Sequence, residues 1–322
     1  MSRCIPVAAA EACANCGKPD GDGMKLKNCT ACRLVKYCGV DCQRAHRKKH
    51  KKVCKQRVAE LKDEELYGQG HERPEGDFCP ICTLPIPLPM GDHSGINACC
   101  MKRVCHGCIL AAQNRGMFEC PFCRTPTTQD NTSLLAMAQK RVDKKDPAAI
   151  LFLGDQYCHG KLGLDRDVQR SIEIFTEAAE LGSIEAHVKL GSQYFDGEGV
   201  AQDMEKAFNH FEVAAKKGHL GARHNLGLHE GKNGNYKRAV RHWLISAKMG
   251  EGNSLKMIKK MFSGGVATKE QYAEALRGYQ ESVDEMKSPE REEVKALLSR
   301  MDSKESRAHH EGKGTKDQPR MK

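Results

Sequence analysis

The chain has 322 residues, a formal net charge of +10 and 17 cysteines. This length allows two or three domains, and no apolar stretch approaches the length of a membrane span, so we expect no part of the chain in a membrane. The first residues make a poor secretory signal, because their short alanine-rich stretch is interrupted by Pro6. We therefore expect a reducing compartment, the cytoplasm or the nucleus, where cysteines bind metal in preference to forming disulfides.

The positive charge is smaller than the formal count indicates. A cysteine binds zinc as a thiolate, so fifteen bound cysteines and four zinc ions would reduce the net charge to about +3. The densest basic cluster, residues 47–52, lies among candidate zinc ligands, where nearby cations favour thiolates. A nuclear import signal and a phosphate contact are alternative uses of this cluster, but a solvated, charge-balancing surface is the favoured interpretation.

Fifteen of the seventeen cysteines lie between Cys13 and Cys123, and most of them fall in pairs. Two such pairs supply the four thiolates of one tetrahedral structural zinc site. Because this region contains few large apolar side chains, metal must take the place of a hydrophobic core. The N-terminal third is therefore predicted to contain two consecutive zinc modules.

The first module, residues 13–54, has four candidate ligand pairs. Their order is Cys13/Cys16, Cys29/Cys32, Cys38/Cys42 and His50/Cys54. The last two pairs have a spacing of four residues, which places both members on one face of a helix. We expect the first and third pairs to share one ion and the second and fourth pairs to share the other. His46 lies on the same helical face, so spacing alone leaves one candidate surplus.

The first module resembles a MYND-type zinc finger in the run Lys36-Tyr37-Cys38 and in Cys42-Gln43-x-x-His46-x-x-x-His50-x-x-x-Cys54. The resemblance implies one zinc site of Cys13, Cys16, Cys38 and Cys42, and another of Cys29, Cys32, His50 and Cys54, with His46 as a non-ligand. It also implies a shallow groove for short proline-containing peptides. Arg47 stands where such fingers often carry an aromatic residue.

The second module, residues 77–126, has eight cysteines, which suit two interleaved zinc sites. Their order resembles the all-cysteine variety of the RING finger. That resemblance implies one site of Cys79, Cys82, Cys105 and Cys108, and another of Cys99, Cys100, Cys120 and Cys123. The adjacent Cys99 and Cys100 depart from the usual spacing. Lys102, which stands where a histidine could replace one of them, is a poor ligand because it is protonated near neutral pH.

A RING finger has no catalytic nucleophile. By this resemblance, the module docks a ubiquitin-charged conjugating enzyme and holds the thioester in a reactive conformation, which is catalysis by positioning. The matching contact residues are Ile81 and Pro121, which supply apolar contact, and Arg124, which supplies a planar set of hydrogen-bond donors. Ile109 and Leu110 stand where many active RING fingers carry tryptophan. In the alternative interpretation, Ile81 and Pro121 are buried filler and Arg124 is a solvated loop end.

The C-terminal half follows two linking segments and is repetitive. A charged linker is expected at residues 55–76, and a connecting helix with its own linker at residues 127–145. Leu-Gly pairs then begin at Leu153, Leu190 and Leu226, and small-residue pairs followed by glycine recur at a similar interval. Such a period is typical of stacked helix pairs, in which neighbouring repeats form the core together.

These motifs resemble Sel-one-like repeats, relatives of the tetratricopeptide repeats, over residues 146–282. The expected fold class is two small zinc-stabilised modules followed by an all-α helical-repeat solenoid. Phe175, Phe211 and Trp243 fit packing between helices better than a ligand site. The charged tail, residues 283–322, is expected to be partly helical and then disordered over about its last twenty residues, which lack apolar content.

The sequence thus predicts a zinc-dependent ubiquitin ligase of the RING type with four zinc ions, two per finger. Its expected partners are a ubiquitin-conjugating enzyme and a protein or peptide substrate, captured by the repeats and the MYND-type finger. The alternative is a non-enzymatic scaffold with the same protein-interaction surfaces. Nucleic acid is not an expected partner, because zinc-bound thiolates cancel most of the positive charge.

Overall fold

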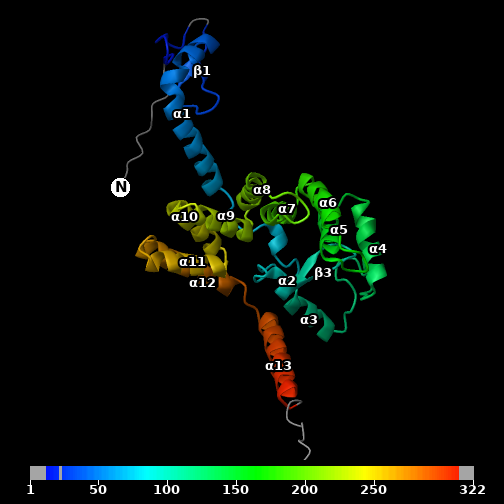
Figure 1. Cartoon of the computed structure of the whole chain (residues 1–322). Coiled ribbons are helices and arrows are strands. Elements are labelled where there is room, and N and C mark those ends of the chain that lie inside the picture. The colour runs from blue at the N-terminus through cyan, green and yellow to red at the C-terminus, as the bar shows by residue number, and fades with distance from the viewer. Residues whose placement is uncertain (1–11, 22–23, 312–322) are drawn as a thin grey trace, which may run out of the picture. The chain divides into compact units, whose positions relative to one another are not determined.

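The computed structural model describes residues 12–21 and 24–311, with side chains described as far as Arg300. The chain divides into two compact units at the boundary between Gln69 and Gly70. The first unit holds the first zinc module and a long helix, and the second holds the second zinc module and the helical repeats (Figure 1). The predicted fold class, two small zinc modules and an all-α solenoid, is therefore confirmed.

The first unit is built on a short hairpin and one long helix. Strands β1 (Lys27–Asn28) and β2 (Lys36–Tyr37) pair antiparallel, and helix α1 (Val40–Gly68) follows them. The buried cluster consists of Leu26, Tyr37 and three cysteines. So little apolar surface cannot hold a fold by itself, which agrees with the expectation that metal replaces the core. Helix α1 runs without a break into residues predicted to begin a linker.

The second zinc module consists of short elements around a small buried cluster. They are the 3-10 helix η1 (Glu75–Asp77), α2 (Met90–His93), β3 (Ser94–Ile96), β4 (Arg103–Cys105) and α3 (His106–Asn114). Strands β3 and β4 pair antiparallel. Ile86 and Val104 are buried beside the ligand candidates Cys79 and Cys105.

The remaining elements are helices, and most of them stack as antiparallel pairs. They are α4 (Asn131–Val142), α5 (Pro147–His159), α6 (Val168–Glu180), α7 (Ile184–Asp196), α8 (Met204–Lys216), α9 (Leu220–Lys232), α10 (Tyr236–Lys248), α11 (Gly252–Ser263), α12 (Lys269–Glu285) and α13 (Pro289–Glu311). The pairs α5/α6, α7/α8 and α9/α10 follow one another in an arc, and α11 and α12 continue it (Figure 1). Among the described residues, no helix combines the length and apolar character needed to cross a bilayer.

Local sequence signals set where the repeat helices begin and end. Asp167, Ser183 and Asp203 each cap a helix, since the side-chain oxygen accepts a hydrogen bond from a backbone N–H of the first turn. Gly160 and Gly197 end α5 and α7 in the left-handed conformation, which glycine adopts without a steric penalty.

The glycine of each Leu-Gly pair marks a close contact between the two helices of a repeat. A Cβ atom on Gly191 would lie 2.6 Å from Cε1 of Phe211, and a Cβ atom on Gly154 would lie 2.6 Å from the same atom of Phe175. In the third repeat, Gly227 faces the indole of Trp243 in the same way, at 2.5 Å. These aromatic residues are fully buried. The repeated motif therefore encodes a glycine on the first helix that receives an aromatic ring from the second.

The inner face of the arc is turned toward the second zinc module. The first helices of successive repeats, α5, α7, α9 and α11, line a cavity of about 790 Å³ together with Met90, Ile96 and Arg103 of that module. The Lys189–Asp155 ion pair, with N–O at 2.9 Å, lies in the same lining. The second zinc module therefore faces part of the concave surface that repeat proteins offer to partners.

The C-terminal tail differs from expectation in its helix content. Disorder was expected from about residue 303, yet α13 continues to Glu311. The reason is that glutamate, arginine, lysine and alanine favour a helix even without an apolar face. Residues 312–322, also expected to be disordered, lie outside the described residues.

The contact at Gly191 can be tested by adding one methyl group. We expect Gly191→Ala to destabilise the repeats by about 1–3 kcal/mol, because the new Cβ overlaps the ring of Phe211. Gly231→Ala on α9 is the matched control, since its Cβ would meet its nearest atom at an ordinary contact distance of 3.4 Å. This substitution should stabilise the helix by up to about 1 kcal/mol, because alanine has a higher helix propensity than glycine. Urea unfolding followed by circular dichroism measures both. Equal effects would contradict the packing account.

Candidate metal centres

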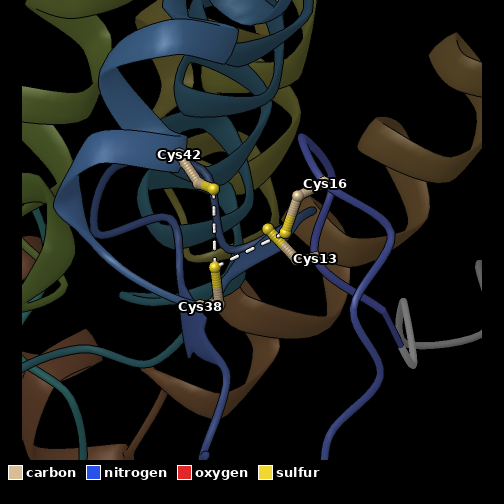
Figure 2. Close-up of side chains that lie close together, drawn as sticks. All are labelled: Cys13, Cys16, Cys38 and Cys42. Carbon is tan, nitrogen blue, oxygen red and sulfur yellow. Dashed lines mark hydrogen bonds between the residues drawn. The ribbon is translucent and has the colours of Figure 1, made fainter.

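Four groups of side chains bring ligand atoms together in the way a zinc ion requires. In each group, all four ligand atoms lie within 4.8 Å of one another. The groups are Cys13/Cys16/Cys38/Cys42, Cys29/Cys32/His50/Cys54, Cys79/Cys82/Cys105/Cys108 and Cys99/Cys100/Cys120/Cys123. Figure 2 shows the first of them, with the four sulfur atoms pointing toward one another.

The spacing and chemistry of these donors fit zinc. A tetrahedral ion with Zn–S bonds of about 2.3 Å places its sulfur ligands about 3.8 Å apart. The sulfur atoms of Cys82 and Cys105 are 3.8 Å apart, and those of Cys29 and Cys54 are 3.9 Å apart. Sets of four thiolates, or of three thiolates and one imidazole, are those of structural zinc sites with no open position. The described residues therefore form four zinc sites, two in each module.

Four of the cysteine pairs each lie on a backbone turn of the same type. In the turn that begins at Cys29, the N–H of Arg33 donates to the carbonyl of Cys29 at 3.0 Å, and the N–H of Cys29 donates to the carbonyl of Val35 at 2.8 Å. Equivalent bonds surround the pairs that begin at Cys13, Cys79 and Cys120. The residue after the second cysteine has a positive φ in each turn; these residues are Gly17, Arg33, Thr83 and Arg124. The short Cys-x-x-Cys spacing is thus converted into a fixed turn that aims both sulfur atoms at one point.

Helix α1 supplies ligands to both sites of the first module. Cys42 belongs to the first group, while His50 and Cys54 belong to the second. Their separations of eight and four residues place them on one side of the helix. His50 is buried, and its Nε2 lies 3.1 Å from the sulfur of Cys32.

His46 lies on the same helical face but outside both groups. Its Nδ1 lies 3.1 Å from the hydroxyl oxygen of Tyr37, and its ring stacks on that of His50 with 5.8 Å between centroids. It therefore contacts Tyr37 and the ligand candidate His50 without belonging to either group, which agrees with the non-ligand role implied by the MYND resemblance.

The adjacent cysteines of the second module reach one site because the chain turns sharply there. The N–H groups of Cys100 and Met101 both donate to the carbonyl of Asn97, and Met101 has a φ of 57°. The sulfur of Cys99 lies 3.3 Å from that of Cys123, and the sulfur of Cys100 lies 3.6 Å from that of Cys120. Lys102 points elsewhere, with its ammonium 4.3 Å from the ring centroid of Phe122.

The thiols within one group differ in acidity. The pKa of Cys79 is lowered to about 4, chiefly by a hydrogen bond from Cys105. Burial, by contrast, raises the pKa of Cys108 to about 12. Zinc must displace the protons that the higher-pKa thiols hold, so zinc affinity falls as the pH is lowered.

The three residues expected to contact a conjugating enzyme all lie at the surface. Ile81 is 44% exposed, and Pro121 and Arg124 are also exposed. The alternative of buried filler therefore fails for Ile81 and Pro121. Met117 and Phe118, which precede the last cysteine pair, add further exposed apolar surface that the sequence reasoning overlooked.

One contact with a metal centre, made by an arginine of α13, could not be predicted from the sequence. Arg291 of α13 places its Nη2 atom 3.4 Å from the sulfur of Cys82, although 209 residues separate them. Arginine in a charged helical segment normally indicates a solvated surface. Only the tertiary structure shows that this one reaches a candidate zinc ligand.

Comparison with known proteins agrees with this architecture of zinc fingers and helical repeats. Residues 13–54 match the MYND finger family, and residues 147–183, 184–219 and 220–251 match the Sel1 repeat. The chain therefore contains a MYND finger followed, after the second cysteine-rich module, by Sel1 repeats.

Solved structures of repeat proteins are similar to this chain. A Sel1 repeat protein from Oxalobacter formigenes is 25% identical, with 55% of this chain and 71% of that chain covered and a TM-score of 0.44. The protein c5321, a protective antigen of uropathogenic Escherichia coli strains with an SLR fold, is 19% identical, with 55% and 37% covered and a TM-score of 0.42. Zinc fingers joined to Sel1 repeats are the parts of a protein-interaction scaffold.

The ligand assignment in the first module can be tested on a matched pair of histidines. We expect native mass spectrometry of the full chain to find four zinc ions, reduced to three by His50→Ala at limiting zinc, because that change removes the only nitrogen ligand of its group. His46→Ala should keep all four ions. Loss of zinc from His46→Ala with retention by His50→Ala would reverse the assignment.

Proposed function

We propose that this protein is a zinc-dependent ubiquitin ligase of the RING type. The observation that carries the proposal is the exposure of Ile81, Pro121 and Arg124 at the positions that a RING finger uses to hold a conjugating enzyme. Each of the three lies within or next to a cysteine pair of the second module. The proposed zinc ligands would therefore fix the backbone of every contact residue.

The proposed mechanism is positioning, with no covalent step on this chain. Ile81 and Pro121 would bury apolar surface of the conjugating enzyme, and Arg124 would donate hydrogen bonds to the enzyme and to ubiquitin at once. Holding the thioester close to its attacking amine lowers the entropic part of the barrier. The zinc ions would maintain this surface without touching the reacting atoms.

Arg124 lies in a turn with an unfavourable backbone conformation. Its φ of 59° lies in the left-handed region, where a residue other than glycine costs about 1–2 kcal/mol. The equivalent positions in the other three turns are Gly17, Arg33 and Thr83, with φ of 74°, 56° and 59°. What supports the proposed role is that Arg124 is exposed directly after the last cysteine of the module, where a partner can reach it.

The proposed substrate site is the groove of the MYND finger. It has a volume of about 550 Å³, and its lining includes Ala31, Tyr37 and Val58. Its cations are Arg44, Arg47, Lys51 and Lys55, and none of the described residues that line it is an aspartate or a glutamate. Such a groove suits a peptide with acidic residues around an apolar one. The repeats would contribute surfaces that their contact with the second zinc module leaves open.

The ligase proposal can be tested by replacing Arg124 with glycine, which removes the guanidinium and relieves the backbone strain. We expect Arg124→Gly to leave folding and zinc content intact, because glycine favours this conformation, and to lower ubiquitin chain formation at least tenfold. The assay uses purified full-length protein with a panel of conjugating enzymes.

Thr83→Gly is the matched control for this experiment. Thr83 has the same φ of 59° after the first cysteine pair of the same module, and its substitution should leave ubiquitin transfer unchanged. Equal activity of wild type and Arg124→Gly would reject the role of Arg124. Absence of transfer by wild type with every conjugating enzyme would favour the non-enzymatic scaffold.

A further inference from the structure

Arg291 makes a set of contacts that ties the C-terminal helix to the second zinc module. Its Nη1 atom donates to the carbonyl oxygens of Pro85 and Met286, each at 2.6 Å. Its Nη2 atom donates to the carbonyl of Leu84 at 3.3 Å and lies 3.4 Å from the sulfur of Cys82. One side chain thus bridges the start of α13 and the loop that follows the first cysteine pair.

That loop is also the support of Ile81. The carbonyl of Leu84 already accepts the N–H of Cys79 at 3.0 Å, and the N–H of Thr83 donates to the carbonyl of Cys79 at 2.8 Å. Arg291 therefore adds a second donor to a carbonyl that closes the turn around Ile81. A planar guanidinium can bond several acceptors at fixed angles, which a lysine ammonium cannot reproduce.

The backbones of α3 and α13 are also in close contact. A Cβ atom on Gly107 would lie 2.9 Å from the backbone nitrogen of Arg291 and 3.0 Å from the carbonyl carbon of Glu290. Gly107 lies between Cys105 and Cys108, two members of the same zinc group. The helix therefore meets this group from two sides, at the Cys82 loop and at the turn that carries Cys105 and Cys108.

The charge of the group explains why an arginine suits this place. Four thiolates and one Zn²⁺ leave two negative charges, and Cys79 and Cys105 are buried. A hydrogen bond from a cation to a ligand sulfur offsets part of that charge. Residues that contact metal ligands in this way commonly change metal affinity by about 10- to 100-fold when replaced.

We propose that Arg291 is a positioning residue of the second zinc module. Its guanidinium holds the Cys82 thiolate and the loop at residues 82–85, so the module is complete only when the start of α13 is docked on it. The C-terminal helix is then a structural part of the zinc module, and it fixes the position of Ile81. The last statement rests on the proposed function, whereas the effect on zinc does not.

The test measures zinc release and cysteine reactivity in the full chain. Arg291→Gln removes the positive charge and the planar set of guanidinium donors, whereas Arg291→Lys keeps only the charge. Arg300→Gln, on the exposed end of the same helix, is the matched control. Zinc release to a chromogenic chelator gives the rate for each ion. Native alkylation with iodoacetamide, mapped by mass spectrometry, identifies the cysteines that become free.

We expect Arg291→Gln to accelerate the release of one zinc ion by about tenfold or more, with new alkylation confined to Cys79, Cys82, Cys105 and Cys108. Arg291→Lys should recover only part of the effect. Gly107→Ala, whose new Cβ would meet both the backbone nitrogen and the Cγ atom of Arg291, should displace α13 and release the same ion.

Two outcomes would overturn the proposal. One is release and alkylation in Arg291→Gln that match those of Arg300→Gln. The other is equal loss from all the zinc sites, which would indicate general destabilisation. A ubiquitin assay on the same variants separates the two proposals, because selective zinc loss can occur whether or not the wild type transfers ubiquitin.

Discussion

Tetrahedral coordination by sulfur is the constraint on which both N-terminal modules depend. Each group joins two pairs of ligands that lie well apart in the chain, so one ion fixes segments that apolar packing is too sparse to hold. The same coordination dictates the turns at the cysteine pairs and the left-handed residue after each of four of them. Those turns fix the positions of the exposed residues that we propose contact a conjugating enzyme, such as Ile81 and Arg124.

The repeats rely on a different constraint, the close approach of helices at glycine. Phe175, Phe211 and Trp243 each fill the space that a missing side chain leaves on the partner helix. This packing forms an arc that presents one face to the second zinc module. At the far end of the arc, α13 returns to that module through Arg291. The module is thus supported by residues on both sides of it in the sequence.

The local features of this protein could be read from its sequence, because they depend on spacing. Pairs of cysteines two or four residues apart predicted the zinc groups, and the Leu-Gly period predicted the helix pairs. Contacts between distant segments could not be read in this way. Nothing in the residues around Arg291 distinguishes it from Arg300, and only the approach of α13 to Gly107 makes the difference. For the same reason the sequence did not predict that the concave face of the repeats would meet a segment of its own chain.

The continuity of α1 has a consequence for how the MYND finger acquires its metal. Cys42, His50 and Cys54 lie on one helix but serve two ions. The ion that binds first must order this helix from its unfolded state, and the second then finds its ligands already aligned. The two binding events are therefore coupled through helix formation, and binding of the second ion is favoured. A finger of this kind therefore passes from empty to full over a narrower range of zinc concentration than two independent sites would.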